Sequence, residues 1–283
     1  MEFVLHFPQG PISRYVEHIT YYAGFTPDHS REKLLPDGAI EIIVDLTETP
    51  KRLYDDIDGE AGVDFRKAWI SGMHRKFIVI EAQPMSSMLV IRFRPGGAET
   101  LLCQRACDLT DSVFSLTDVL GTASASLRDR VLEAGGANAR LAAAEGWLKE
   151  QPGWGELLDP LIAYLTEQLS TPGRIRIRDL CAETGYTTRH VLDRFKATVG
   201  ITPKQFARIH RFKRLLAILA RPGEYDPAFG ATPLPSPDWS ALAAELSYSD
   251  QSHLVNEFRG FAGMAPGAYV AAYRGLENYL PIG

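Results

Sequence analysis

Short runs of apolar and β-branched residues, separated by turn residues, make up the first 95 positions of the chain. The run 39–46 follows Pro36-Asp37-Gly38, a sequence typical of a tight turn. Short strands with frequent turns are typical of small barrels and sandwiches, so we expect one of these over residues 1–97. Residues 11–22 are an alternative helix, because apolar residues recur there at helical spacing. Further strand candidates are residues 3–7, 69–70, 76–82 and 85–93.

The pattern becomes helical after the Arg-Pro-Gly-Gly sequence at 94–97. Residues 98–170 are rich in Ala, Leu and charged residues and lack β-branched runs, which favours helices. Helices are also expected over 174–275, interrupted by a proline-rich connection at 221–238. The predicted fold class is therefore α+β: a β-rich N-terminal domain (1–97), a helical connector or dimerisation region (98–170) and an all-α C-terminal domain (171–283).

The C-terminal region contains an internal duplication. Residues 179–206 are repeated at 241–269, with an offset of 62 that becomes 63 after one inserted residue. The agreement covers apolar, glycine and proline positions together, so it is not a chance match. Corresponding pairs are Leu180 and Leu242, Ala182 and Ala244, Tyr186 and Tyr248, Phe195 and Phe258, Gly200 and Gly263, and Pro203 and Pro266.

Each copy has the pattern of a helix, a tight turn and a second helix. In the first copy, Gly185 is placed to end the leading helix and Thr187 to cap the next one. Val191 and Phe195 are four residues apart and therefore face the core together. In the second copy, Leu254 and Phe258 have the same spacing, with Ser249 or Asp250 as the cap. A long helix over 203–220, with Pro203 in its first turn, is expected to join the two units.

Charge is distributed unevenly along the chain. The formal net charge is −5, yet residues 172–220 hold 11 Lys and Arg against 3 Asp and Glu. Such a basic block indicates an anionic partner, although a solvated basic surface is an equal alternative on charge alone. The chain has three cysteines and neither a signal-peptide pattern nor a long apolar run, which favours a cytoplasmic protein without a membrane segment.

The duplicated motif resembles the DNA-binding domain of AraC/XylS-type transcriptional regulators. The resemblance covers about residues 160–275 and rests on Leu180–Ala182, Gly185–Thr187, Phe195-Lys196 and Gly200–Pro203, together with the second copy. Residues 1–150 resemble the cupin-like N-terminal domain of one subgroup of these regulators, through residues 35–38, 71–72 and 93–97. The resemblance implies two helix-turn-helix units that enter adjacent major-groove segments of double-stranded DNA.

The resemblance also implies which side chains contact DNA. Base contacts are expected from Arg189, Leu192 and Asp193 in the first unit and from Gln251, Ser252 and Asn256 in the second. Asp193 and Asn256 stand where the family often has a basic residue; Asp193 has the chemistry to accept a hydrogen bond from cytosine. Phosphate contacts are expected from Arg174, Arg176, Thr187, Arg194, Lys196, Lys204, Arg208 and Arg259.

The N-terminal domain offers a candidate effector pocket of Tyr22, Trp69, Arg92 and Arg94, with core packing or a solvated face as the alternatives. Cys103 and Cys107 are four apart on an expected helix and form either a redox pair or small buried side chains; Cys181 is expected in the core. The seven histidines include no His-x-His pair, so no metal is expected. No cofactor is expected either.

The sequence therefore predicts a DNA-binding transcriptional regulator and not an enzyme, because no catalytic motif is present. Its expected partners are double-stranded DNA, a small-molecule effector, a second copy in a homodimer and, for an activator, RNA polymerase. The alternative is a cupin-like enzyme or metal-binding protein with an appended DNA-binding domain.

Overall fold

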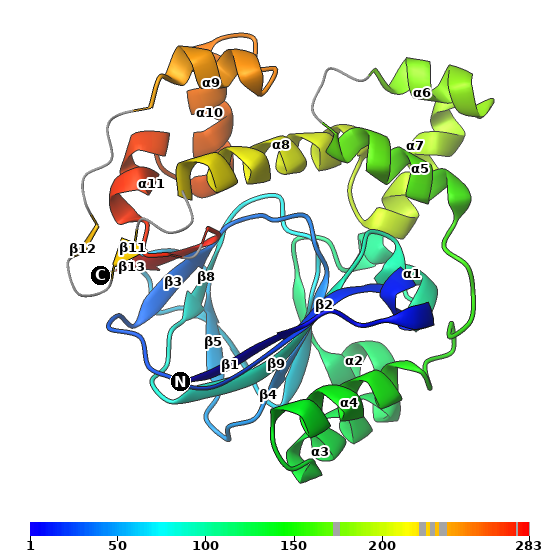
Figure 1. Ribbon diagram of the computed structural model, residues 1–283, viewed down its shortest axis with the longest axis vertical. Coiled ribbons are helices and arrows are strands. Elements are labelled where there is room, and N and C mark those ends of the chain that lie inside the picture. Colours follow the sequence, from blue (N-terminus) through cyan, green and yellow to red (C-terminus); the bar gives the residue numbers. More distant parts are fainter. Residues whose placement is uncertain (172–175, 221–224, 227–229, 232–236, 276, 283) are drawn as a thin grey trace.

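Two antiparallel sheets form the N-terminal half of the chain. The computed structural model describes residues 1–171, 176–220, 225–226, 230–231, 237–275 and 277–282 (Figure 1). The first sheet has six described strands in the order β1 (Glu2–His6), β2 (Val16–Phe25), β9 (Ser86–Phe93), β4 (Glu41–Asp45), β7 (Ala68–Ser71) and β10 (Val113–Ser115). The second has the order β13 (Tyr279–Ile282), β3 (Arg31–Leu34), β8 (Ile78–Glu81), β5 (Lys51–Tyr54) and β6 (Gly62–Phe65).

Alternation along β4 shows how the first sheet is built. Ile42 and Val44 are fully buried on one face, where the helices that follow the barrel pack. Glu41 and Ile43 lie on the opposite face, toward the interior between the two sheets. Register is continuous across the sheet, since Glu41 lies opposite Arg92 of β9 on one side and Ser71 of β7 on the other.

Helices cover the outer face of the first sheet (Figure 1). The indole Nε1 of Trp147 donates to the carbonyl of Ala123 at 2.9 Å, and Trp147 is buried. Arg128 is also buried, and its Nε donates to the carbonyl of Asp45 at 2.8 Å, which ties this helical layer to β4. The helices of this region are α1 (Gly97–Leu102), α2 (Leu116–Leu120), α3 (Ala125–Glu133) and α4 (Ala137–Leu148), with short 3-10 turns at Gly10–Arg14, Ala106–Asp108 and Gly121–Ser124.

The C-terminal half is mainly helical. Its described helices are α5 (Pro160–Ser170), α6 (Ile177–Thr184), α7 (Thr188–Val199), α8 (Pro203–Ala220), α9 (Trp239–Glu245), α10 (Gln251–Ala262) and α11 (Pro266–Ala272). A two-residue pair, β11 (Tyr225–Asp226) and β12 (Gly230–Ala231), lies within the proline-rich connection. The predicted fold class, a β-rich N-terminal part followed by a helical C-terminal part, is confirmed.

Three segments differ from the sequence expectation. The alternative helix at 11–22 was wrong beyond Arg14, because residues from Val16 onward pair with β1 and β9 as β2. The region 98–170 is not wholly helical, since β10 adds to the edge of the first sheet beside β7. The C-terminal part is not all-α either, because β13 pairs with β3 in the second sheet.

Besides the pairing of β13 with β3, the two halves of the chain contact each other through both duplicated units and α8. The carbonyl of Gly200, after α7, accepts from Oγ1 of Thr110 at 2.7 Å. The carbonyl of Phe261, in α10, accepts from the backbone N–H of Phe77 at 3.0 Å. Between them α8 crosses one end of the barrel (Figure 1), where His210 lies against Gly38. The barrel therefore supports both duplicated units and the helix that joins them.

The contact between Gly263 and Phe77 gives a direct test of this docking. Gly263 ends α10 with a φ of +65°, and a Cβ there would lie 2.3 Å from Cε1 of Phe77. We expect Gly263→Ala to lower the free energy of unfolding by about 2–4 kcal/mol, from backbone strain and overpacking together. The measurement is urea denaturation of the full chain.

Gly260→Ala is the matched control. Gly260 lies within α10, and a Cβ there would meet nothing within 4 Å. Alanine favours a helix more than glycine does, so this variant should be unchanged or more stable by up to about 1 kcal/mol. Equal effects of the two substitutions would contradict the docked arrangement.

Candidate nucleic-acid interface

The first duplicated unit is formed by α6, a tight turn and α7. Gly185 ends α6 with a φ of +74°, a conformation that favours glycine. Thr187 precedes α7, and its Oγ1 accepts from the backbone N–H of His190 at 3.2 Å. Val191 and Phe195 are fully buried, as their spacing predicted. The turn and cap that the sequence predicted are therefore present.

The opposite face of α7 is open to solvent. The side chain of Arg189 is 93% exposed and that of Asp193 76% exposed, with 3.7 Å between Nε and Oδ2. Leu192, although apolar, is 37% exposed. Because an exposed ion pair of this length contributes little free energy, the guanidinium of Arg189 is free to turn toward a ligand. Thr188 and Lys196 complete the exposed face.

The second unit repeats this construction with α9 and α10. Asp250 is the cap, and its Oδ1 accepts from the backbone N–H of His253 at 2.7 Å. Leu254 and Phe258 are fully buried. Gln251, Ser252, Asn256 and Arg259 are exposed. The six expected base contacts therefore all lie on the exposed faces of α7 and α10.

A groove separates the two units. Figure 1 shows them at opposite ends of α8, with α6 and α9 on the side of α8 that faces away from the barrel. The groove has a volume of about 760 Å³. Its floor is α8, which contributes Lys204, Arg208, Arg211 and Arg214, and Asn256 lines its side. Of the two exposed helix faces, that of α10 contributes Asn256 to this groove, whereas no residue of α7 lines it.

A buried carboxylate fixes the second unit on α8. The side chain of Glu257 is only 3% exposed; it accepts from Nε of Arg208 at 2.7 Å and from Nη2 of Arg211 at 2.7 Å. The guanidinium of Arg211 also lies over the ring of Tyr248, 4.2 Å from the ring centroid. Since a buried charge is strongly destabilising without a partner, these contacts restrict how α10 lies on α8.

The first unit uses the equivalent position with the opposite charge. Arg194 corresponds to Glu257 at the offset of 63, and its Nε donates to Oδ2 of Asp159 at 2.7 Å. Asp159 is also the cap of α5, where it accepts from the N–H of Leu161. The second helix of each unit, α7 or α10, is therefore attached to a neighbouring helix through the residue before its buried phenylalanine.

The expected phosphate contacts fall into three groups. Arg176, Thr187, Lys196, Lys204 and Arg259 are exposed without such a pairing, whereas the exposed Arg194 and the partly exposed Arg208 already hold carboxylates. Arg174 lies outside the described residues. Sequence reasoning missed Arg211 and Arg214. Arg208, Arg211 and Arg214 follow one another at intervals of three residues, a spacing that places neighbouring side chains close together on a helix.

A second candidate site is the cavity between the two sheets, with a volume of about 530 Å³. Tyr22, Trp69 and Arg92 of the expected effector pocket line it, together with Lys213 and Leu216 of α8 and Tyr279 of β13. The expectation for Arg94 was wrong. β9 ends at Phe93, so the alternation does not continue, and Nε of Arg94 instead donates to the carbonyl of Ser13 at 2.7 Å.

The cysteines do not form the helical pair that their spacing suggested. α1 ends at Leu102, and Cys103 adopts a φ of +55°, so Cys103 and Cys107 do not share a helix face. Cys103 is exposed and Cys107 half-buried, while Cys181 is buried as expected. Among the described residues, no group of three or more His, Cys, Asp or Glu side chains is arranged to hold a metal. In the same part of the chain, no helix has the length and apolar character needed to span a bilayer.

Comparison with known proteins gives one family match and several similar folds. Residues 5–115, from β1 to the end of β10, match the family model described as "Domain of unknown function (DUF6597)". No curated protein matches the chain. ToxT from Vibrio cholerae O395 is 11% identical over 91% of this chain and 99% of that chain, with a TM-score of 0.46.

Two further solved structures are similar at the same level or lower. The unsaturated-fatty-acid-bound ToxT from Vibrio cholerae strain SCE256 is 10% identical over 91% of this chain and 96% of that one, with a TM-score of 0.46. A probable AraC family transcriptional regulator from Rhodopseudomonas palustris CGA009 is 24% identical over 40% of this chain and 94% of that one, with a TM-score of 0.30. At these values, the function of this chain has to be argued from its own residues.

Proposed function

We propose that the chain is a sequence-specific DNA-binding transcriptional regulator of the AraC/XylS type, controlled by a signal that its N-terminal cavity receives. The observation that carries this proposal is the pair of exposed helix faces, on α7 and α10, in units at opposite ends of α8, the helix that contributes four cationic side chains to a groove. A short helix that is buried on one side and polar on the other is the element that helix-turn-helix proteins place in the major groove.

Base recognition falls to side chains that are free of strong internal contacts. Arg189 is the best candidate, because a guanidinium can donate two hydrogen bonds to guanine. Its neighbour Asp193 has the chemistry to accept from the amino group of cytosine. In the second unit, Gln251 and Asn256 carry amide groups suited to adenine. Leu192 and Ser252 complete the proposed contacts with bases.

Affinity is proposed to come from the cationic side chains around these helices. Lys196, Lys204 and Arg259 are exposed and unrestricted by the contacts described above. Arg208 and Arg211 share one carboxylate, so together with Glu257 they retain one net positive charge in the groove. A phosphate there would meet guanidinium groups that are already oriented. Contacts of this kind position a protein on DNA and depend on salt.

The cavity is the proposed site of the signal because it has walls from both halves of the chain. Most of its lining belongs to the barrel, but Lys213 and Leu216 come from the helix that joins the two DNA-binding units. A bound effector would therefore contact α8 directly and change DNA binding if it favours one arrangement of the units. Dimerisation through the 98–170 region, contact with RNA polymerase and a cytoplasmic location remain predictions.

Substitution of Arg189 and Lys196 separates base recognition from phosphate binding. We expect Arg189→Ala to lower affinity for the preferred operator by about 1–3 kcal/mol and to leave affinity for random duplex nearly unchanged. Lys196→Ala should weaken binding to both duplexes and reduce the salt dependence by about one charge. The measurement is the Kd for each duplex at several salt concentrations, with the operator obtained by selection from random DNA. Equal losses of affinity for both duplexes on Arg189→Ala would contradict a base contact by Arg189.

Glu257→Gln tests whether the pose of α10 matters for recognition. This change keeps the size of the side chain but removes the charge that holds Arg208 and Arg211. We expect operator affinity to fall about tenfold as α10 loses its fixed orientation, while affinity for random duplex rises because the freed arginines attract phosphate.

Glu245→Gln is the control for charge. Glu245 is an exposed carboxylate on α9 of the same unit, so the variant removes the same charge without loosening α10. It should leave the ratio of operator to random affinity unchanged. If both variants shift this ratio alike, the effect of Glu257 is one of net charge and not of position.

A further inference from the structure

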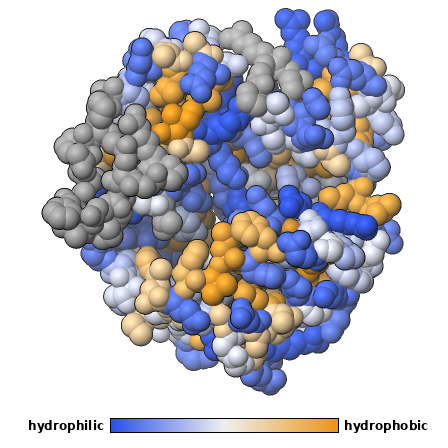
Figure 2. Space-filling model, in the orientation of Figure 1, coloured by the Kyte–Doolittle hydropathy of each residue, from blue (hydrophilic) through white to orange (hydrophobic). Residues whose placement is uncertain are grey.

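The cavity of the barrel has aromatic walls. It lies between the two sheets and is lined by six aromatic side chains: Phe3, Tyr22, Phe25, Phe65, Trp69 and Tyr279. The other lining residues are partly aliphatic and partly polar or charged. Met1, with Phe3 and Leu5 of the edge strand β1, also lines it; the three are 76, 57 and 45% exposed, so they form an open side. Figure 2 shows hydrophobic residues gathered over this part of the barrel. Such walls accept an apolar molecule of modest size.

Carboxylates outnumber cations around this cavity. Six of the lining residues are acidic and four are basic; the acidic ones are Glu17, Glu32, Asp37, Glu41, Glu81 and Glu277, and the basic ones are Lys51, Arg52, Arg92 and Lys213. Arg52 is directed away, since its Nε donates to Asp64 at 2.7 Å, outside the lining. The lining therefore carries an excess of negative charge.

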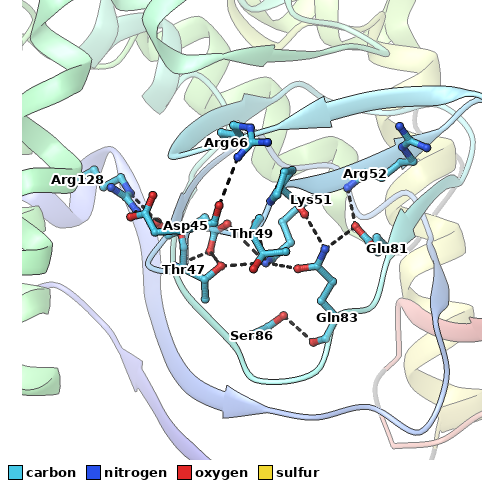
Figure 3. Close-up of polar contacts among 12 residues, drawn as sticks. Asp45, Thr47, Thr49, Lys51, Arg52, Arg66, Glu81, Gln83, Ser86 and Arg128 are labelled. Carbon is cyan, nitrogen blue, oxygen red and sulfur yellow. Dashed lines mark hydrogen bonds and ion pairs between the residues drawn. The ribbon is translucent and has the colours of Figure 1, made fainter.

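Two cationic groups in the cavity, those of Arg92 and Lys51, are occupied by partners from the chain itself, whereas Lys213 makes no hydrogen bond or ion pair with the described residues. Arg92 is buried and donates from Nε to Glu17 at 3.0 Å and from Nη1 to both Glu41, at 2.7 Å, and Asp37. At the other end, Nζ of Lys51 donates to Gln83 at 2.6 Å and to Oγ1 of Thr47 at 3.0 Å (Figure 3). An anionic ligand at Arg92 or Lys51 would have to displace these contacts.

Glu41 and Glu32 each have a single side-chain partner among the described residues. Within the described part of the chain, Oε2 of Glu41 accepts no hydrogen bond, and Glu32 is paired only through Oε1, at 2.7 Å from Nε2 of His29. Burial raises the pKa of Glu41, and neighbouring Asp37 raises it further, despite the contact with Arg92. Glu41 thus lacks sufficient compensation for its charge.

An independent observation comes from Asp45, which stands on the same inward row of β4 as Ile43 and Glu41. It is 1% exposed, and its Oδ2 accepts no hydrogen bond from the described residues; the nearest cation, Nζ of Lys51, is 3.6 Å away. Burial raises the pKa of the Tyr22 phenol, and the negative charges of Glu32 and Asp45 raise it further. Burial likewise raises the pKa of Tyr279, and the negative charge of Glu41 raises it further. The two tyrosines therefore stand beside carboxylates that each have only one cationic neighbour.

We propose that the cavity binds an organic cation: an amine on an apolar body, with its ammonium group between Glu32 and Glu41 and beside the rings of Tyr22 and Tyr279. Carboxylates attract the ammonium charge, and aromatic faces favour a cation over an anion. The inference rests on the proposed role of the cavity as the signal site and adds the chemical class of the signal. Because Tyr279 belongs to β13, the strand that follows α11, the cation contacts a segment joined to the second DNA-binding unit.

A matched pair of probes tests the class of ligand. 4-Phenylbutylamine and 4-phenylbutyrate share an apolar body and differ in charge, and both are small enough for a cavity of 530 Å³. Isothermal titration calorimetry of the full chain should show the amine binding at least about tenfold more tightly than the acid, because one buried uncompensated carboxylate is worth at least that ratio.

The variant for this test is the double substitution Glu32→Gln/Glu41→Gln, which keeps side-chain size and should reduce amine affinity at least about tenfold. Glu133→Gln, which alters an exposed carboxylate on α3, is the control and should bind the amine as the unmodified chain does. Thermal unfolding without ligand shows whether each variant is folded. Amine binding that survives in a folded double variant would overturn the assignment.

The remaining outcomes separate this inference from the proposed function. Tighter binding of the acid would overturn the proposal that the ligand is a cation, while leaving the cavity as a signal site. Absence of binding by both probes up to about 5 mM would overturn the cation site, since a cavity with this excess of charge should reach millimolar affinity. DNA binding is measured separately with the operator, so its failure would count against the proposed function and not against the cation.

Discussion

Two aromatic pairs that involve α8 hold α7 and α10 in place. Phe206 of α8 packs edge-to-face against Phe195 of α7, with ring centroids 5.5 Å apart. Phe212 of α8 packs in the same way against Phe258 of α10, at 5.1 Å. All four rings are fully buried. Because Phe206 and Phe212 are six residues apart on a rigid helix, the two contacts are separated by about 9 Å along its axis. The spacing and orientation of the two units depend on this constraint.

The two copies share a backbone but have diverged in charge. Position 194 is an arginine that reaches Asp159 of α5, and the equivalent position 257 is a glutamate that reaches Arg208 and Arg211 of α8. In the first unit the contact lies partly in solvent, and in the second the carboxylate is almost wholly buried. The second unit is therefore attached more rigidly to the joining helix, whereas the first presents the more accessible guanidinium, Arg189. The two copies of the motif thus differ in charge and burial at the same position.

The barrel and the helices form a continuous structure. β13 completes the edge of the second sheet, and the carbonyl of Asn278, just before it, accepts from the N–H of Leu35 at 2.8 Å. The same segment is tied to α11, since the hydroxyl of Tyr269 donates to the carbonyl of Glu277 at 2.7 Å. α8 approaches the barrel at His210, whose pKa is lowered to about 4 by burial and by the nearby charges of Lys213 and Arg214. His210 is therefore neutral at physiological pH, as its contact with the barrel requires.

The sequence by itself determined the local elements of the helical half. The positions of Gly185, Thr187 and Pro203 and the spacing of Val191 and Phe195 depend only on neighbouring residues, and the structure has helix ends, a cap and buried faces where those residues predicted them. The same local logic identified Tyr22, Trp69 and Arg92 as neighbours of one interior, and it failed for Arg94 because the end of a strand is set by its partner strand.

Only the tertiary structure decided which distant residues meet. The pairing of β13 with β3 joins positions more than two hundred residues apart, and the short apolar runs at 113–115 and 279–282 do not by themselves distinguish strand from loop. Likewise, Arg92 looked like a free cation in the sequence, but packing of the sheets surrounds it with Glu17, Asp37 and Glu41. Charge in a buried site depends on what the fold brings within a few ångströms, and that information lies in no single segment of the chain.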